Sequence, residues 1–180
     1  MKRLSVGLGP LLVLALAGCT HTPFGQPGGP AAAPRLAHMR RDGIAFSYPA
    51  AWRYRRRGFL TTMSEGIVDL STQRMVDPCR THGNATTCSW PTDHLRPGGI
   101  VVSWSRFGGL VAPGHLPRSG VTVKTLRDPY CRRVGGAVEL EGRIVTRRHR
   151  VYDVDACLAR PGLLANAIAF RAMLASARPG

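Results

Sequence analysis

Short apolar or alternating runs, each bounded by glycine, proline or charged residues, most constrain what this chain can fold into. The runs are 44–48, 66–71, 99–106, 120–127, 137–146 and 151–158. In the first, Ile44, Phe46 and Tyr48 alternate with smaller residues, which is the period-two pattern of a strand with one buried face. The segments between the runs are too short for several crossover helices. The sequence therefore predicts six or seven strands in a mainly antiparallel sheet.

The carboxyl end has a helical period instead. Apolar residues there are spaced by three and four: Leu163, Ala167, Phe170, Leu174 and Ala177. This spacing predicts an amphipathic helix that packs on a core and stops at Arg178-Pro179-Gly180, where proline cannot continue it. An antiparallel sheet covered by a terminal helix is an α+β domain, which is the fold class that we predict.

The first eighteen residues have the layout of a secretory signal. Lys2 and Arg3 precede a mostly apolar run from Val6 to Ala17, and small residues follow it. The run is interrupted by Pro10 and is shorter than the roughly twenty residues that span a membrane. We expect residues 1–18 to direct export and then to be removed.

Leu16-Ala17-Gly18-Cys19 resembles the lipobox of bacterial lipoproteins, in which a lipid is attached to the cysteine thiol and the signal is cleaved just before it. The resemblance implies that Cys19 carries acyl chains such as palmitate and holds the protein on the outer face of the cell membrane. The alternative is an ordinary signal peptide cut near Gly18. Residues 19–41 are rich in Pro, Gly and Ala and predict a tether, which leaves 42–180 for a single domain.

Five cysteines fit this interpretation, because an exported protein with an odd number has one thiol left over. Lipidation of Cys19 leaves four, which predict two disulfides with three possible connectivities. Cys79 and Cys88 enclose a short polar loop, so their pairing is the simplest. Cys131 would then pair with Cys157.

The second bridge requires a particular chain path. A hairpin that turns around Arg147 and Arg148 would set Cys157 opposite roughly Val138, so the chain must fold back at Gly135-Gly136 to bring Cys131 near. A zinc site would use Cys79, His82 and Cys88, with His94 as a fourth ligand. These spacings match no standard ligand set, and we predict neither a metal nor a cofactor.

The formal net charge is +15, and almost all of the positive charge is arginine. The arginines cluster at 53–57, 132–133 and 147–150. Basic surfaces attract polyanions. Export argues against nucleic acid and favours an anionic envelope polymer, lipid headgroups or a partner protein. The alternative is that arginine usage reflects a GC-rich genome and no function.

The sequence contains no G-x-S-x-G, S-x-x-K or H-E-x-x-H motif. Two carboxylate pairs could do acid–base work on glycans: Asp153 with Asp155, and Glu139 with Glu141. Their alternation with apolar residues indicates instead the solvent side of two strands, where the acids would pair with Arg143, Arg148 and Arg150. Trp90, Trp104 and Phe107 have strand-like spacing and are expected in the core. We predict a non-enzymatic binding or accessory module, with a wall-active hydrolase that uses Asp153 or Asp155 as the alternative.

Two segments resemble proteins of the PsbP-like and Mog1-like fold. Phe46-Ser47-Tyr48-Pro49, followed by Trp52, is similar to their opening segment, and Met173-Leu174-Ala175-Ser176 is similar to their last helix. Actinobacterial surface lipoproteins of this fold also begin with a lipobox and a proline-rich tether. The resemblance covers about residues 42–178 and implies a curved antiparallel sheet flanked by helices, with a non-catalytic accessory role. It implies no binding residues, and the two disulfides depart from the plant proteins.

Overall fold

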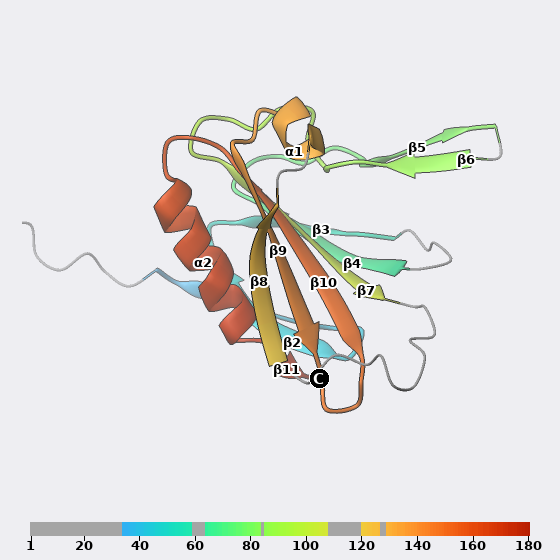
Figure 1. Ribbon diagram of the computed structural model, residues 1–180, viewed down its shortest axis with the longest axis vertical. Coiled ribbons are helices and arrows are strands. Elements are labelled where there is room, and N and C mark those ends of the chain that lie inside the picture. The colour runs from blue at the N-terminus through green and yellow to red at the C-terminus, as the bar shows by residue number, and fades with distance from the viewer. Residues whose placement is uncertain (1–33, 59–63, 84, 108–119, 127–128) are drawn as a thin grey trace, which may run out of the picture. The chain divides into compact units, whose positions relative to one another are not determined.

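The computed structural model describes residues 34–58, 64–83, 85–107, 120–126 and 129–180 (Figure 1). The signal and Cys19 lie outside these residues. The strands are β1 (Leu36–Arg41), β2 (Ile44–Pro49), β3 (Arg53–Arg56), β4 (Ser64–Ser71), β5 (Cys79–His82), β6 (Ala85–Cys88), β7 (Ile100–Phe107), β8 (Gly120–Leu126), β9 (Val138–Val145), β10 (Val151–Leu158) and β11 (Arg178–Pro179). The helices are α1 (Pro129–Arg133) and α2 (Leu163–Ala175).

A six-stranded antiparallel sheet, here called the main sheet, has the strand order β3-β4-β7-β10-β9-β8. Five of its strands are the predicted runs that begin at residues 66, 99, 120, 137 and 151, and the run at 44–48 is β2. The predicted terminal helix is α2, which ends at Ala175, before the predicted stop at Arg178-Pro179-Gly180, where Arg178 and Pro179 form β11 instead. The antiparallel α+β class with a carboxyl-terminal helix is therefore confirmed.

One face of the main sheet is apolar and carries the core. Alternate residues of its central strands are buried there: Ile100, Val102 and Trp104 of β7, Leu140 and Ile144 of β9, and Tyr152, Val154, Ala156 and Leu158 of β10. Helix α2 contacts β2, β8, β9 and β10 and buries Phe170, Met173 and Leu174 in the same cluster. Phe46 of β2 stacks on Trp104 with ring centroids 4.0 Å apart. The alternating residues of the strands and the three-and-four-spaced residues of α2 thus meet in one core, as predicted. The helix is not amphipathic, however, because Leu164 and Ile168 are exposed on its outer side.

The folded domain begins earlier than we expected. Strand β1 lies within residues 19–41, which the sequence analysis assigned to the tether, and it pairs along its whole length with β2. Strand β11 adds to the other edge of β2, so these strands form a three-stranded sheet. Only Ala37 and Met39 of β1 pack on the core. So few apolar residues explain why the composition of this segment indicated a spacer.

Both predicted disulfides are present. Cys79–Cys88 is a cross-strand pair in the hairpin of β5 and β6, which extends beyond the main sheet (Figure 1). Cys131–Cys157 joins α1 to β10 with a Cα–Cα distance of 5.5 Å. The β9–β10 hairpin pairs Cys157 with Glu139, one residue from the predicted Val138.

The chain does fold back at Gly135-Gly136, where a turn follows α1. A Cβ atom on Gly136 would overlap the Sγ atoms of both Cys131 and Cys157. Glycine is therefore required at position 136 for the disulfide to pack as it does. Among the described helices, none is long and apolar enough to cross a membrane.

Candidate functional site

The second face of the main sheet, which points away from α2, is rich in charged residues. We call it the polar face, and its charged and hydroxyl side chains include Arg55, Arg57, Asp69, Ser103, Ser105, Lys124, Glu139, Glu141, Arg143, Asp153 and Asp155. The strand register aligns Arg55, Asp69, Ser103, Asp155, Glu141 and Lys124 opposite one another, each on a different strand. One polar row therefore crosses all six strands, because side chains alternate between the two faces of a sheet.

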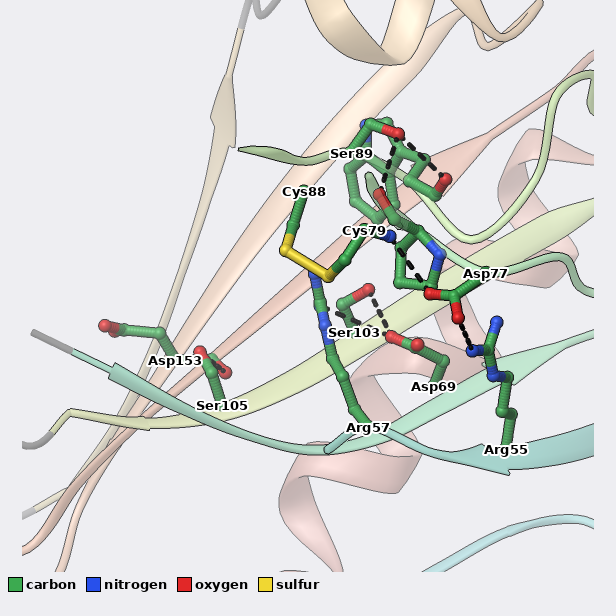
Figure 2. Close-up of polar contacts among 12 residues, drawn as sticks. Arg55, Arg57, Asp69, Asp77, Cys79, Cys88, Ser89, Ser103, Ser105 and Asp153 are labelled. Atoms are coloured by element: carbon green, nitrogen blue, oxygen red, sulfur yellow. Dashed lines mark hydrogen bonds and ion pairs between the residues drawn. A yellow bond between two sulfur atoms is a disulfide. The ribbon is translucent and has the colours of Figure 1, made fainter. Parts of the chain in front are cut away.

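A buried ion pair lies near one end of this row. Asp69 is fully buried, with its Oδ1 atom 3.3 Å from Nη1 of Arg57. The Ser103 hydroxyl donates a 2.8 Å hydrogen bond to the same Oδ1 atom (Figure 2). Burial raises the pKa of Asp69, while Arg57 and Ser103 favour its ionised form. Burial also lowers the pKa of Arg57.

The base of the β5–β6 hairpin lies beside this pair. Arg57 borders one hollow together with Cys88 and a second hollow together with Cys79 and Asp69. A small apolar cluster of Trp90, Leu95, Val101, Cys131, Cys157 and Ala159 covers the adjoining end of the polar face. The hairpin and this cluster thus partly cover the polar face, which would otherwise be open to water.

Two of the acids that the sequence singled out are neutralised by cations. Arg143 Nε lies 2.6 Å from Asp153 Oδ1. Glu141 Oε1 lies 3.1 Å from Lys124 Nζ and 3.8 Å from a nitrogen of Arg143. The predicted pairing with Arg143 is confirmed. The predicted pairing with Arg148 and Arg150 is wrong, because within the described residues neither forms an ion pair with these acids and both are exposed at the β9–β10 turn.

Asp155 differs from its neighbours. Among the described residues its carboxylate has no hydrogen bond and no ion-pair partner within 4.0 Å. Burial, together with the nearby Glu141 and Asp153 carboxylates, raises the pKa of Asp155 to about 6. The more distant charges of Arg57 and Arg143 oppose this shift and do not cancel it. Asp155 is thus an acid whose ionised form is disfavoured, and it lies in the centre of the polar row.

A hollow of about 210 Å³ opens beside this carboxylate, and we call it the Asp155 pocket. Its lining residues come from five strands or strand ends and from α1: Arg57, Cys88, Ser89, Trp90, Ser103, Tyr130, Glu139 and Asp155. Trp90 is buried, whereas Tyr130 is exposed and holds the Arg133 guanidinium 4.8 Å from its ring centroid. The volume is below the ~300–1,000 Å³ of drug-sized ligand sites, so the pocket suits a small molecule or a single terminal group.

The structure separates the predicted carboxylate pairs. Asp155 and Glu139 line the pocket, while Asp153 and Glu141 lie outside it. Trp104 and Trp90 are buried in the two apolar clusters, as expected, and Trp90 also forms a pocket wall. Phe107 was expected in the core but is only half-buried at the end of β7. Sequence reasoning missed Arg57, Asp69 and Ser103. The signal available for Asp69 was its position as a lone acid within the apolar run Ile67-Val68-Asp69-Leu70.

The zinc alternative is excluded, because Cys79 and Cys88 are bonded to each other and offer no thiolate. Across the part of the chain that the structure describes, no group of three or more His, Cys, Asp or Glu side chains is placed to hold a metal ion. No known protein family model, curated protein or solved structure matches this chain. Any functional assignment must therefore come from the chemistry of the sites themselves.

Proposed function

We propose that this protein is a lipid-anchored binding module on the outer face of the cell membrane, without enzymatic activity, and that the Asp155 pocket is its ligand site. The observation that carries the proposal is a small hollow lined by two aromatic rings and by the Asp155 carboxylate, which has no ion-pair partner among the described residues. An antiparallel sheet with a carboxyl-terminal helix also supports the finer assignment to the PsbP-like or Mog1-like fold.

The geometry favours binding over catalysis. The Ser103 hydroxyl donates its hydrogen to Asp69, whose carboxylate is fully buried and already engaged by Arg57. Among the residues that the structure describes, no histidine lines the pocket, and a hydroxyl nucleophile needs an adjacent base to be activated. Glu139 is only 5% exposed, which restricts its contact with a polymer chain. A pocket of about 210 Å³ has room for one group of a ligand.

The lipid anchor at Cys19 is the part of the proposal that fixes location. A Cys19→Ser variant should move from the membrane pellet to the supernatant when cells are fractionated in high salt. The reason is that stable attachment requires two or more acyl chains, each worth about 0.8 kcal/mol per buried methylene. Immunoblots of both fractions would measure the distribution. A variant that stayed fully in the pellet would contradict the lipobox assignment.

An anionic partner is supported by the exposed arginines at the β9–β10 turn, Arg147, Arg148 and Arg150. The purified chain should be retained on phosphatidylglycerol liposomes at low salt and released at high salt, because salt screens exposed charges. The double change Arg147→Gln/Arg148→Gln should reduce retention. The matched control is Arg132→Gln/Arg133→Gln on α1. Equal losses in the two variants would mean that net charge, and not this turn, determines retention.

A wall-active hydrolase remains the second candidate, because Asp155 and Glu139 line one pocket and Asp155 has a pKa of about 6, as a general acid requires. The test is release of soluble fragments from purified wall polymer. Release by the unaltered chain and its loss in Asp155→Asn would replace the binding proposal with this one.

A further inference from the structure

We infer that the Asp155 pocket takes a small organic cation, an alkylammonium group whose charge pairs with the Asp155 carboxylate and whose carbon chain lies against Trp90 and Tyr130. The inference rests on the proposed binding function and names the chemical class of the ligand. The charged residues that line the pocket are two acids, Glu139 and Asp155, and one base, Arg57, whereas the protein as a whole is strongly basic.

Half of the acidic residues of this strongly basic protein lie on the polar face. They are Asp69, Glu139, Glu141, Asp153 and Asp155, five of the ten in the chain. Most of the cations near them are already engaged: Arg57 with Asp69, Arg143 with Asp153, and Lys124 with Glu141. The Asp155 carboxylate is left facing the pocket. The positive charge elsewhere on the protein is screened beyond about 10 Å at moderate salt, so the local carboxylates decide which ions enter.

The walls of the pocket favour an organic ion over a bare metal ion. A hollow of about 210 Å³ is larger than a bare ion, and the described residues provide no set of three metal-ligating side chains. Trp90 and Tyr130 offer ring surface for methylene groups and attract a cation through their π faces. The Tyr130 ring already holds one cation, since the Arg133 guanidinium lies 4.8 Å from its centroid. The face of the Tyr130 ring that borders the pocket could attract an ammonium through the same cation–π interaction.

The surroundings of Asp155 make its charge costly in the absence of a ligand. The charged groups that act on it are Glu141 and Arg143 on β9, Asp153 on its own strand and Arg57 just after β3. Glu139 on β9 and Tyr130 on α1 line the same pocket. Carboxylates outnumber cations in this set. Acids held ionised against their surroundings are typical of functional sites. A bound ammonium would relieve this repulsion, so the pocket should bind cations in preference to neutral or anionic molecules.

The experiment is an NMR titration of the ¹⁵N-labelled full chain carrying Cys19→Ser, with n-butylammonium chloride at pH 7.5. We expect shifts of the Trp90 indole N–H and of the Ser89, Ser103 and Asp155 amides, with a Kd on the order of 1–10 mM. Sodium chloride at equal ionic strength should not produce them. Affinity should fall as the pH is lowered from 7.5 to 5, because Asp155, whose pKa is about 6, becomes protonated and loses the charge that binds the cation.

Two variants on the same strand test the role of Asp155. Asp155→Asn should weaken binding about tenfold or more, the value of a charged hydrogen bond. It should keep or raise the Tm at pH 7, because the ionised acid is disfavoured in the fold. Asp153→Asn is the matched control, since Asp153 lies outside the pocket and pairs with Arg143. Its effect on affinity should stay within about fivefold.

Neutral and anionic analogues separate failure of this inference from failure of the proposed function. If n-butanol or butyrate shifts the same resonances as strongly as n-butylammonium, the pocket is a ligand site but not for cations. If calcium chloride does so, the site is inorganic and the inference is wrong. If no probe in the set perturbs the pocket, both the inference and the pocket assignment fail.

Discussion

Replacing Asp69 with asparagine should lower the free energy of unfolding by about 3–5 kcal/mol, the cost of removing one partner from a buried ion pair. The Arg57 side chain is only 11% exposed and lies 3.3 Å from the fully buried Asp69. The variant would leave the Arg57 charge near a neutral amide in a region of low dielectric constant. Urea denaturation of the chain, compared with the unaltered protein under the same conditions, measures the loss.

Asp77→Asn is the matched control for this prediction. Asp77 also forms an ion pair with an arginine, because its Oδ2 atom lies 3.1 Å from Nη2 of Arg55, but the Asp77 side chain is 72% exposed. The same chemical change should therefore have a far smaller effect on unfolding. Adding Arg57→Met to Asp69→Asn should recover stability, because the buried guanidinium that has lost its Asp69 partner is then gone. A double variant less stable than Asp69→Asn alone would contradict the buried-charge explanation.

Removing the Cys131–Cys157 disulfide with Cys131→Ala/Cys157→Ala should cost about 3.5 kcal/mol, the chain-entropy value for a loop of this length, since the two cysteines are 26 residues apart. Both side chains are buried in the apolar cluster under α1, so the loss should appear in global unfolding. The measurement is the urea midpoint of the non-reduced protein and of the variant.

Two controls test whether the effect on global stability depends on the buried surroundings of the Cys131–Cys157 disulfide. Cys79→Ala/Cys88→Ala opens a bridge in a hairpin of exposed polar residues that belongs to a separate two-stranded sheet, so it should change global stability much less. Gly136→Ala should cost about 1–3 kcal/mol through overpacking when the Cys131–Cys157 bridge is present. It should cost clearly less once both cysteines are alanine. Equal costs in the two backgrounds would mean that the sulfur atoms do not exclude the Cβ atom.

Local patterns predicted the regular elements well. The period-two runs gave all but one of the strands of the main sheet, and the three-and-four spacing gave α2, because those residues face one core. Strand β3 was not predicted, since its sequence Arg53-Tyr54-Arg55-Arg56 has no apolar alternation. Its place at the edge of the sheet comes from pairing with β4.

The candidate site was harder to predict because it depends on register. The polar row exists only because five strand pairings align single residues across six strands, and a one-residue slip would move each side chain to the other face. The alternation of Asp153 and Asp155 indicated a solvent-facing side but could not show that Arg143 serves one acid and not the other. The Arg57–Asp69 pair also joins residues whose contact no local spacing reveals.

The place where the tether enters the domain has a mechanical consequence. Among the described strands, β1 is at the edge of its sheet and is hydrogen-bonded to β2 alone. Leu36 at its start lies opposite Pro49 at the end of β2. A force that pulls the proposed anchor away from the domain would break the backbone hydrogen bonds between β1 and β2 one after another, starting at Leu36. The six residues of β1 would then add about 20 Å of reach. Of the residues of β1, Ala37 and Met39 alone would leave the core, so β1 would yield before the main sheet and its pocket are disturbed.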